Sequence, residues 1–143
     1  MSLVVLNASV AAKWFLPGNG ETIVDQAFAL LHRYDKGEIR FIVPDLFWAE
    51  FANVIWKAIR VGRFSKSSGE AAIASLAQRN FPSVPSLKLL DRAFQIATAF
   101  QRTVYDCLYV SLAVDSDAQL ITANERLANA LAAHFPVKWL GAL

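Results

Sequence analysis

Four side chains that can bind a cation or act on a phosphate occur in four short segments of the chain. They are Asn7 in VVLNASVAAKWFL, Glu50 in VPDLFWAEFANVIWKA, Asp106 in RTVYDCLYVSLA and Asn124 in LITANERLANAL. Two are carboxylates and two are amides, and all four offer the hard oxygen atoms that Mg²⁺ and Mn²⁺ prefer. Brought together, they would suit the chemistry of a divalent metal ion beside a phosphate group.

The segments that carry these residues predict strands followed by helices. Short apolar runs alternate with longer segments of helical periodicity, which is typical of parallel strands joined by crossover helices. In such sheets, ligands gather beyond the carboxyl ends of the strands. Asn7 and Asn124 come just after the first and fourth predicted strands, so we expect them to meet Glu50 and Asp106 at one edge of the sheet.

The predicted elements follow from apolar periodicity and from Gly, Pro and capping residues. Pro44 is predicted in the first turn of a helix, where its missing N–H costs nothing, and Ser65 and Thr103 are predicted N-caps. The predicted strands are 3–6, 40–43, 81–84, 119–122 and 137–140. The predicted helices are 10–15, 21–34, 44–61, 65–79, 87–100, 103–114 and 123–133.

Length and composition predict one globular domain over residues 1–143. With 55% hydrophobic and 18% charged residues, the chain is too apolar to be disordered and should leave apolar surface for a partner, so we expect a homodimer. A net charge of +2 is too small to predict nucleic-acid binding by itself.

The sequence gives limited information about the compartment in which the protein occurs. The lone Cys107 cannot form an internal disulfide and lies in an apolar run, which favours a cytoplasmic protein. The apolar start lacks the basic region and cleavage site of a signal peptide, so a core strand and helix are expected there. Asp45 and Glu50 interrupt the most apolar region, and we therefore expect no membrane span.

Glu50 and Asp106 each have an ordinary structural explanation beside the functional one. Glu50 shares a helix face with Asn53 at i+3, and a surface glutamate on an amphipathic helix is the simple alternative. Its many aromatic neighbours make an unpaired carboxylate costly there, however. Asp106 in a first helical turn would complement the helix dipole by up to ~1 kcal/mol. Two such carboxylates in one set of segments favour a metal site over these alternatives.

The order of the four segments resembles that of the PIN-domain nucleases, and most closely the VapC-like toxins of prokaryotic toxin–antitoxin pairs. The resemblance covers nearly the whole chain and implies a three-layer α/β/α domain with a central, mainly parallel sheet of four to five short strands. In that family, acidic side chains at the positions of Asn7, Glu50, Asp106 and Asn124 hold magnesium or manganese and activate water for attack on an RNA phosphodiester. The resemblance therefore implies a metal-dependent ribonuclease with these four metal-binding and catalytic positions, and an antitoxin protein as a partner.

Two of the four positions depart from the family pattern. Asn7 and Asn124 stand where aspartate is usual, so the formal charge of the site falls from four negative charges to two. Two carboxylates balance one divalent ion, and we expect at most one weakly held Mg²⁺ or Mn²⁺. Three interpretations stay open: a divergent enzyme, a noncatalytic binding protein, or a chain inactivated by paired aspartate-to-asparagine changes.

Substrate contacts are predicted around this cluster. Lys13 follows Asn7 by less than two helical turns, Asn53 shares a face with Glu50, and Thr122 resembles the family's threonine before the fourth acid. Trp48 and Trp56 are predicted at a protein interface. The main alternative is a catalytically silent PIN-like module that binds RNA or a protein partner. A flavodoxin-like nucleotide binder would need a glycine-rich loop after the first strand, which NASVAAKW lacks.

Overall fold

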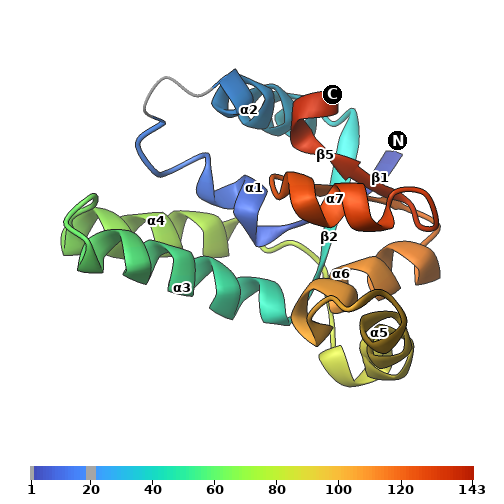
Figure 1. Cartoon of the computed structure of the whole chain (residues 1–143). Helices are drawn as coiled ribbons and strands as arrows, with labels where there is room; N and C mark the ends of the chain where they lie inside the picture. Colours follow the sequence, from blue (N-terminus) through green and yellow to red (C-terminus); the bar gives the residue numbers. More distant parts are fainter. Residues whose placement is uncertain (1, 19–21) are drawn as a thin grey trace.

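A computed structural model describes residues 2–18 and 22–143 of the chain (Figure 1). Its centre is a five-stranded sheet in the order β3-β2-β1-β4-β5, and every pairing is parallel. The central parallel sheet flanked by helices confirms the predicted α/β fold. The strands are β1 (Ser2–Leu6), β2 (Ile39–Pro44), β3 (Ser83–Val84), β4 (Gln119–Thr122) and β5 (Val137–Trp139).

β1 lies at the middle of the sheet, and its register determines which strand ends meet. Val4 pairs with Phe41 of β2 on one side, while Leu6 pairs with Ile121 of β4 on the other. The backbone N–H of Asn7 continues this ladder by donating to the carbonyl of Ile121 at 3.2 Å. The carboxyl ends of β1 and β4 are therefore side by side, as ligand sites in parallel sheets require.

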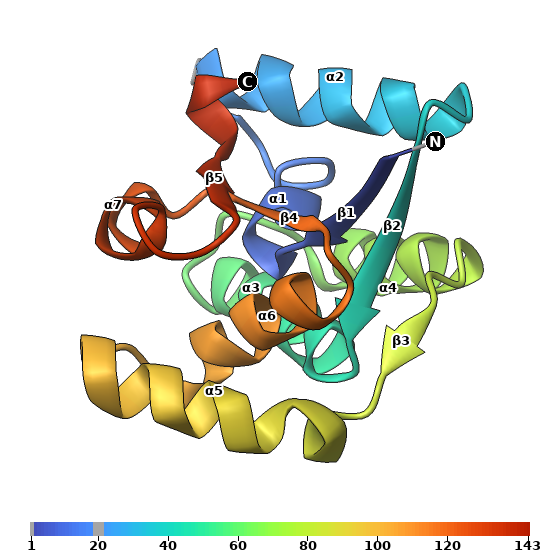
Figure 2. The ribbon, with the colours of Figure 1, turned by 90° about the vertical axis from the view of Figure 1, so that its right-hand side faces the viewer.

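Helices cover both faces of the sheet. Figure 2 shows α2 along one side of the sheet and α6 on the other, with α5 outside α6. α6 contacts β1, β2 and β4, and α3 contacts α1 and α4. The helices are α1 (Ala8–Ala12), α2 (Thr22–Asp35), α3 (Leu46–Arg60), α4 (Lys66–Gln78), α5 (Ser86–Phe100), α6 (Val104–Asp115) and α7 (Glu125–Leu131), followed by a 3₁₀ helix at Leu140–Ala142.

The predicted start of α3 was wrong. Pro44 is the last residue of β2, where it is paired with Val84, and the helix begins only at Leu46. Asp45, between β2 and α3, is held by β3 and the start of α5. Its N–H donates to the Val84 carbonyl at 2.9 Å, and its Oδ1 accepts from the N–H of Ser86 at 3.1 Å. Strand pairing with β3 therefore prevails over the preference of proline for a first helical turn.

Other boundaries moved by a few residues. The first helix begins at Ala8 instead of 10, and the last one begins at Glu125 instead of 123, because in each case an asparagine caps the helix. The strand expected at 81–84 is shortened to Ser83–Val84. The predicted start of a helix at Glu21 lies outside the described residues.

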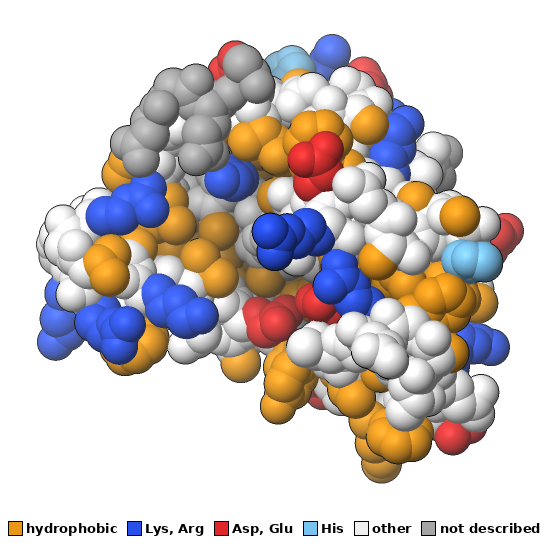
Figure 3. All heavy atoms as spheres, in the orientation of Figure 1, with side chains coloured by type: hydrophobic (Ala, Val, Ile, Leu, Met, Phe, Trp, Pro, Cys, Tyr) orange, Lys and Arg blue, Asp and Glu red, His pale blue; other side chains and the backbone are white. Residues whose placement is uncertain are grey.

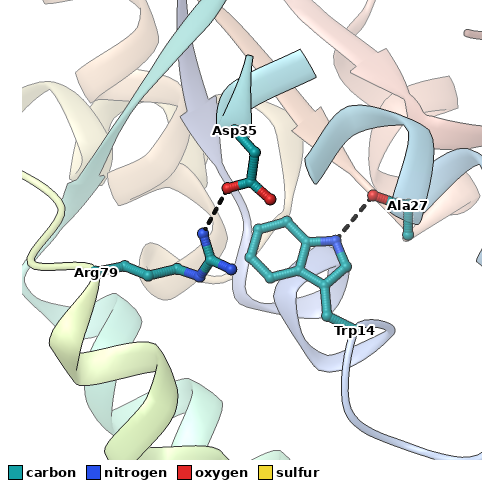
Figure 4. A network of polar contacts seen from close by, with 4 residues as sticks. All are labelled: Trp14, Ala27, Asp35 and Arg79. Atoms are coloured by element: carbon teal, nitrogen blue, oxygen red, sulfur yellow. Dashed lines mark hydrogen bonds and ion pairs between the residues drawn. The ribbon is translucent and has the colours of Figure 1, made fainter. Parts of the chain in front are cut away.

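A small polar network fixes α2 against α1 and α4 (Figure 4). The buried indole N–H of Trp14, just after α1, donates to the carbonyl of Ala27 in α2 at 2.8 Å. Arg79, which ends α4, pairs with Asp35 at the end of α2 at 2.9 Å. These contacts hold the frame around α1, which begins at the candidate site.

The two tryptophans of α3 have different surroundings. Trp48 is half-buried, its indole N–H donates to Ser83 Oγ at 2.9 Å and its ring stacks on Phe81, so its place at an interface stays a prediction. Trp56 is 52% exposed, with the guanidinium of Arg60 over its ring at 5.2 Å. Over the described parts of the chain, no helix is both long enough and apolar enough to cross a membrane.

Candidate functional site

The four predicted residues converge on one cavity at the carboxyl edge of the sheet. The cavity has a volume of about 250 Å³ and lies where α3, α6 and the first residues of α1 and α7 meet. In Figure 3, acidic side chains at the centre of this face have Lys and Arg side chains to the left, above and to the right. The lining residues are Asn7, Ala8, Ser9, Glu50, Asn53, Val54, Lys57, Asp106, Asn124 and Leu127.

Asn7 and Asn124 are both helix N-caps. Asn7 Oδ1 accepts a hydrogen bond from the N–H of Ser9 at 2.9 Å, and Asn124 Oδ1 accepts one from the N–H of Leu127 at 3.2 Å. Both residues have extended backbone, as N-caps do, and their side chains satisfy N–H groups that lack a partner inside α1 and α7. Each amide oxygen keeps a second lone pair for a cation, but neither amide carries charge or accepts a proton at neutral pH.

Glu50 is placed at the cavity by α3 and held there by a tyrosine. The hydroxyl of Tyr109 in α6 donates to Glu50 Oε1 at 2.6 Å. Burial raises the pKa of Glu50 above its ordinary value, the Tyr109 hydrogen bond opposes this rise, and the negative charge of Asp106 adds to it. The carboxylate is thus in surroundings that favour a nearby cation.

Asp106 lies in the first turn of α6, opposite Glu50. Its backbone N–H donates to Oγ1 of Thr103, the predicted N-cap, at 3.1 Å. Burial raises the pKa of Asp106, while the hydrogen bond from Thr103 and the positive charge of Arg102 lower it in part. Burial therefore disfavours the charged form of both carboxyl groups of the cavity, and a bound divalent cation would offset that cost in free energy.

Tyr109 was missed by the sequence analysis, although its hydroxyl donates the hydrogen bond that holds Glu50. Its side chain is fully buried, and burial together with the charge and hydrogen bond of Glu50 raises its pKa. The only signal in the sequence is a hydroxyl-bearing residue three positions after Asp106, on the same helical face. In the apolar run YDCLYVSLA, that signal looks like an ordinary core aromatic.

The three predicted substrate-binding residues have different positions. Asn53 lines the acidic cavity beside Lys57, one turn further along α3. Lys13 lines a neighbouring cavity of about 360 Å³. Thr122 is fully buried in β4, and its Oγ1 accepts from the N–H of Asn124 at 3.1 Å, so it orients the residue that caps α7.

The two cavities adjoin along one groove, because Ser9, Val54 and Asn124 line both of them. Ser9 also joins their walls, since its Oγ accepts from the N–H of Ala123 at 3.1 Å. The second cavity adds Arg63 to the cations at this edge and also has apolar walls. The remaining residues that line it are Ala12, Lys13, Leu16, Pro17 and Ala123.

The donor set of the acidic cavity suits one hard divalent cation. Two carboxylates and two amide oxygens are the ligand types that Mg²⁺ and Mn²⁺ accept, and two negative charges balance one such ion. Within residues 2–18 and 22–143, no cluster of three or more His, Cys, Asp or Glu side chains is arranged to hold a metal. The amides at positions 7 and 124 explain this shortage at the present site, since aspartates there would give four carboxylates.

Solved structures of other proteins share this fold at low sequence identity. PAE2754 from Pyrobaculum aerophilum is 20% identical with a TM-score of 0.67, over 99% of this chain and 91% of that chain. VapBC2 from Rickettsia felis, solved with a DNA fragment from its promoter, is 13% identical with a TM-score of 0.68, over 96% and 98%. VapC20 from Mycobacterium tuberculosis, a Sarcin-Ricin loop cleaving toxin, is 12% identical with a TM-score of 0.63, over 92% and 95%.

Sequence comparison gives the family. Curated proteins provided no match to this sequence. The family model for the PIN domain matches residues 4–131, which include all four segments of the cavity. The structural neighbours agree with this match, because they include VapC toxins of toxin–antitoxin systems. With a match over most of its length and the same parallel sheet, the chain belongs to the PIN-domain family.

Proposed function

We propose that this chain is a metal-dependent endoribonuclease of the VapC-like toxin class, with activity impaired by Asn7 and Asn124. The observation that carries the proposal is the convergence of Glu50 and Asp106 with these two asparagines in one cavity of about 250 Å³. Family membership and the VapC neighbours support a nuclease function. The acidic cavity supplies the place where such chemistry would occur.

Each residue of the cavity has a role in this proposal. Glu50 and Asp106 would hold one Mg²⁺ or Mn²⁺, with the amide oxygens of Asn7 and Asn124 as neutral ligands. When bound, the ion would offset charge on the phosphate and lower the pKa of a bound water. Lys57 and Asn53 would bind the RNA phosphate at the same cavity, with Lys13 and Arg63 along the groove.

The alternative function is a catalytically silent module that binds RNA or a protein partner. It is favoured by one specific feature, which is that both asparagine Oδ1 atoms already serve as helix caps and cannot act as bases. In that case the cavity would bind a cationic group without cleaving a phosphodiester. The groove and its charges would be the functional surface.

A cognate antitoxin is the protein partner that we propose for either function. The second cavity has apolar walls at Ala12, Leu16 and Val54, which suit an apolar helix or an extended tail. Because this cavity adjoins the acidic one, we propose that a basic side chain of the partner reaches Glu50 and Asp106. RNA as a substrate and the buried, unoxidised Cys107 suit a cytoplasmic protein.

The deciding experiment is Mn²⁺-dependent cleavage of a structured RNA by the parent chain and by the Asn7→Asp, Asn124→Asp double variant. We expect cleavage by the variant to exceed that of the parent by at least tenfold, roughly one lost ligand interaction of 1.4 kcal/mol. Adding Glu50→Gln and Asp106→Asn to the double variant provides the control, and should abolish cleavage. Equal cleavage by parent and double variant would show a working site with fewer acids, and no cleavage by either would support the binding module.

A further inference from the structure

Tyr109 has a buried hydroxyl that lies behind the acidic cavity and contacts Glu50, one of the residues lining it. The hydroxyl donates to Glu50 Oε1 at 2.6 Å, and the backbone of Ala8 lies close enough to lower the pKa of Tyr109 in part. The Ala8 N–H belongs to the first turn of α1, where backbone donors have no partner inside the helix. One phenol group therefore ties α6 to α3 beside the start of α1.

These three elements carry three of the four residues that converge on the cavity. Asp106 precedes Tyr109 by three positions on α6, Asn7 directly precedes Ala8, and Glu50 accepts the hydrogen bond. A phenol has one O–H donor, and the contact with Glu50 uses it. The position of Tyr109 is fixed in turn, because its ring is fully buried among core residues.

We propose that Tyr109 is a positioning residue, which engages Oε1 of Glu50 so that Oε2 is the oxygen presented to a cation beside Asp106. The proposal rests on the metal site of the proposed function and specifies how one of its ligands is oriented. A glutamate side chain has several rotatable bonds, and a half-buried carboxylate with no partner would move between them. The hydrogen bond to a rigid aromatic ring removes this freedom before any cation arrives.

The same helix provides a matched control. Tyr105 is also in α6, one residue before Asp106, but its side chain is 61% exposed. The Tyr109→Phe and Tyr105→Phe variants each remove one hydroxyl and keep the ring. Only the first removes the hydrogen bond to Glu50.

The test is side-chain carboxyl ¹³C NMR of the parent chain and both variants, first without metal and then with substoichiometric Mn²⁺. Glu50, one of five glutamates, is assigned as the signal lost in Glu50→Gln. We expect Tyr109→Phe to move the metal-free Glu50 signal and Tyr105→Phe to leave it in place. With Mn²⁺, the Glu50 and Asp106 signals of the parent should broaden to a similar extent, whereas in Tyr109→Phe the Glu50 signal should broaden less than the Asp106 signal.

Several results would overturn the role of Tyr109. The first is a Glu50 signal that does not move in metal-free Tyr109→Phe. The second is equal broadening of the Glu50 and Asp106 signals in that variant with Mn²⁺. The third is loss of broadening from both signals together, which would mean that Tyr109 supports the whole site and does not position Glu50. Absence of Mn²⁺ broadening in the parent would instead contradict the metal site of the proposed function, while the metal-free spectrum still decides the hydrogen bond.

A measurement on the parent chain covers the case in which Tyr109→Phe does not fold. The hydroxyl proton that Tyr109 donates to Glu50 should exchange slowly with solvent. If the Tyr109 hydroxyl exchanges as fast as that of Tyr105, the group is not held and the proposal fails.

Discussion

At positions 7 and 124, one side chain has two tasks with different requirements. As an N-cap, Oδ1 needs only to accept a hydrogen bond, and asparagine and aspartate do this about equally well. As a metal ligand or a base, the same group needs negative charge, which asparagine lacks. The two tasks can therefore be separated by substitution, because aspartate changes the charge of the cavity and preserves the caps of α1 and α7.

The carboxyl groups of Glu50 and Asp106 should make stability depend on pH. Burial raises their pKa values above the ordinary 4.5 and 3.8, so the folded chain favours their protonated forms. The stability that this provides is complete below the unfolded-state pKa and is lost as pH rises through the folded-state pKa. The free energy of unfolding of the parent should therefore fall relative to that of Glu50→Gln or Asp106→Asn as the pH rises above the ordinary pKa values of 4.5 and 3.8.

Urea denaturation with a chelator present, at a series of pH values, measures this difference. Glu70→Gln, on the exposed face of α4, controls for the loss of one carboxylate from the protein as a whole. A difference between Glu50→Gln and the parent that stays constant with pH would contradict the prediction.

At the scale of elements, the hydrogen bond that residue 124 accepts as the N-cap of α7 should matter more to stability than the charge of that residue. Asn124→Ala removes the acceptor for the Leu127 N–H and should lower the free energy of unfolding by about 1 kcal/mol. Asn124→Asp keeps an acceptor and adds a charge that suits a helix N-terminus, so it should be at least as stable as the parent. Asn129→Ala, at an exposed position within the same helix, is the control and should not destabilise the protein. Equal stability of the two alanine variants would exclude a capping role.

The sequence predicted well those features that depend on periodicity and strand ends. The alternation of strands and helices is enough to place Asn7 beside Asn124, because parallel strands have their carboxyl ends at one edge. Pro44 was misplaced because its pairing with Val84 depends on a strand some forty residues away, which local preferences do not contain. Tyr109 was missed for a related reason. Its role depends on a hydrogen bond from α6 to Glu50 of α3, which lies 59 positions earlier in the chain.

At the scale of the whole molecule, α5 presents an apolar stripe that we propose as the homodimer contact. Leu87, Leu90 and Phe94 lie on one helical face and are 82%, 43% and 59% exposed. Figure 1 shows α5 at the outer edge of the molecule, beyond α6. Lys88 and Asp91 border the stripe with opposite charges, which suits the self-complementary pairing of a two-fold dimer.

Leu90→Lys should convert a dimer to a monomer, because it places a charge in the centre of this stripe. Light scattering coupled to size-exclusion chromatography measures the mass directly. Ile73→Lys introduces the same change at an apolar residue of α4 that is 41% exposed, and should leave the dimer intact. A parent chain that elutes as a monomer at high concentration, or a dimer that persists in Leu90→Lys, would refute the assignment.

The position of β1 at the centre of the sheet also determines when the cavity forms during protein synthesis. β1 is made before the other strands, yet Leu6 pairs with Ile121, and the Asn7 N–H needs the Ile121 carbonyl. At about 5–20 residues per second, the ribosome makes that partner several seconds or more after β1. A chain released before β4 has one wall of the cavity missing, so a prematurely terminated product carries both of its carboxylates and still has no site in which to use them.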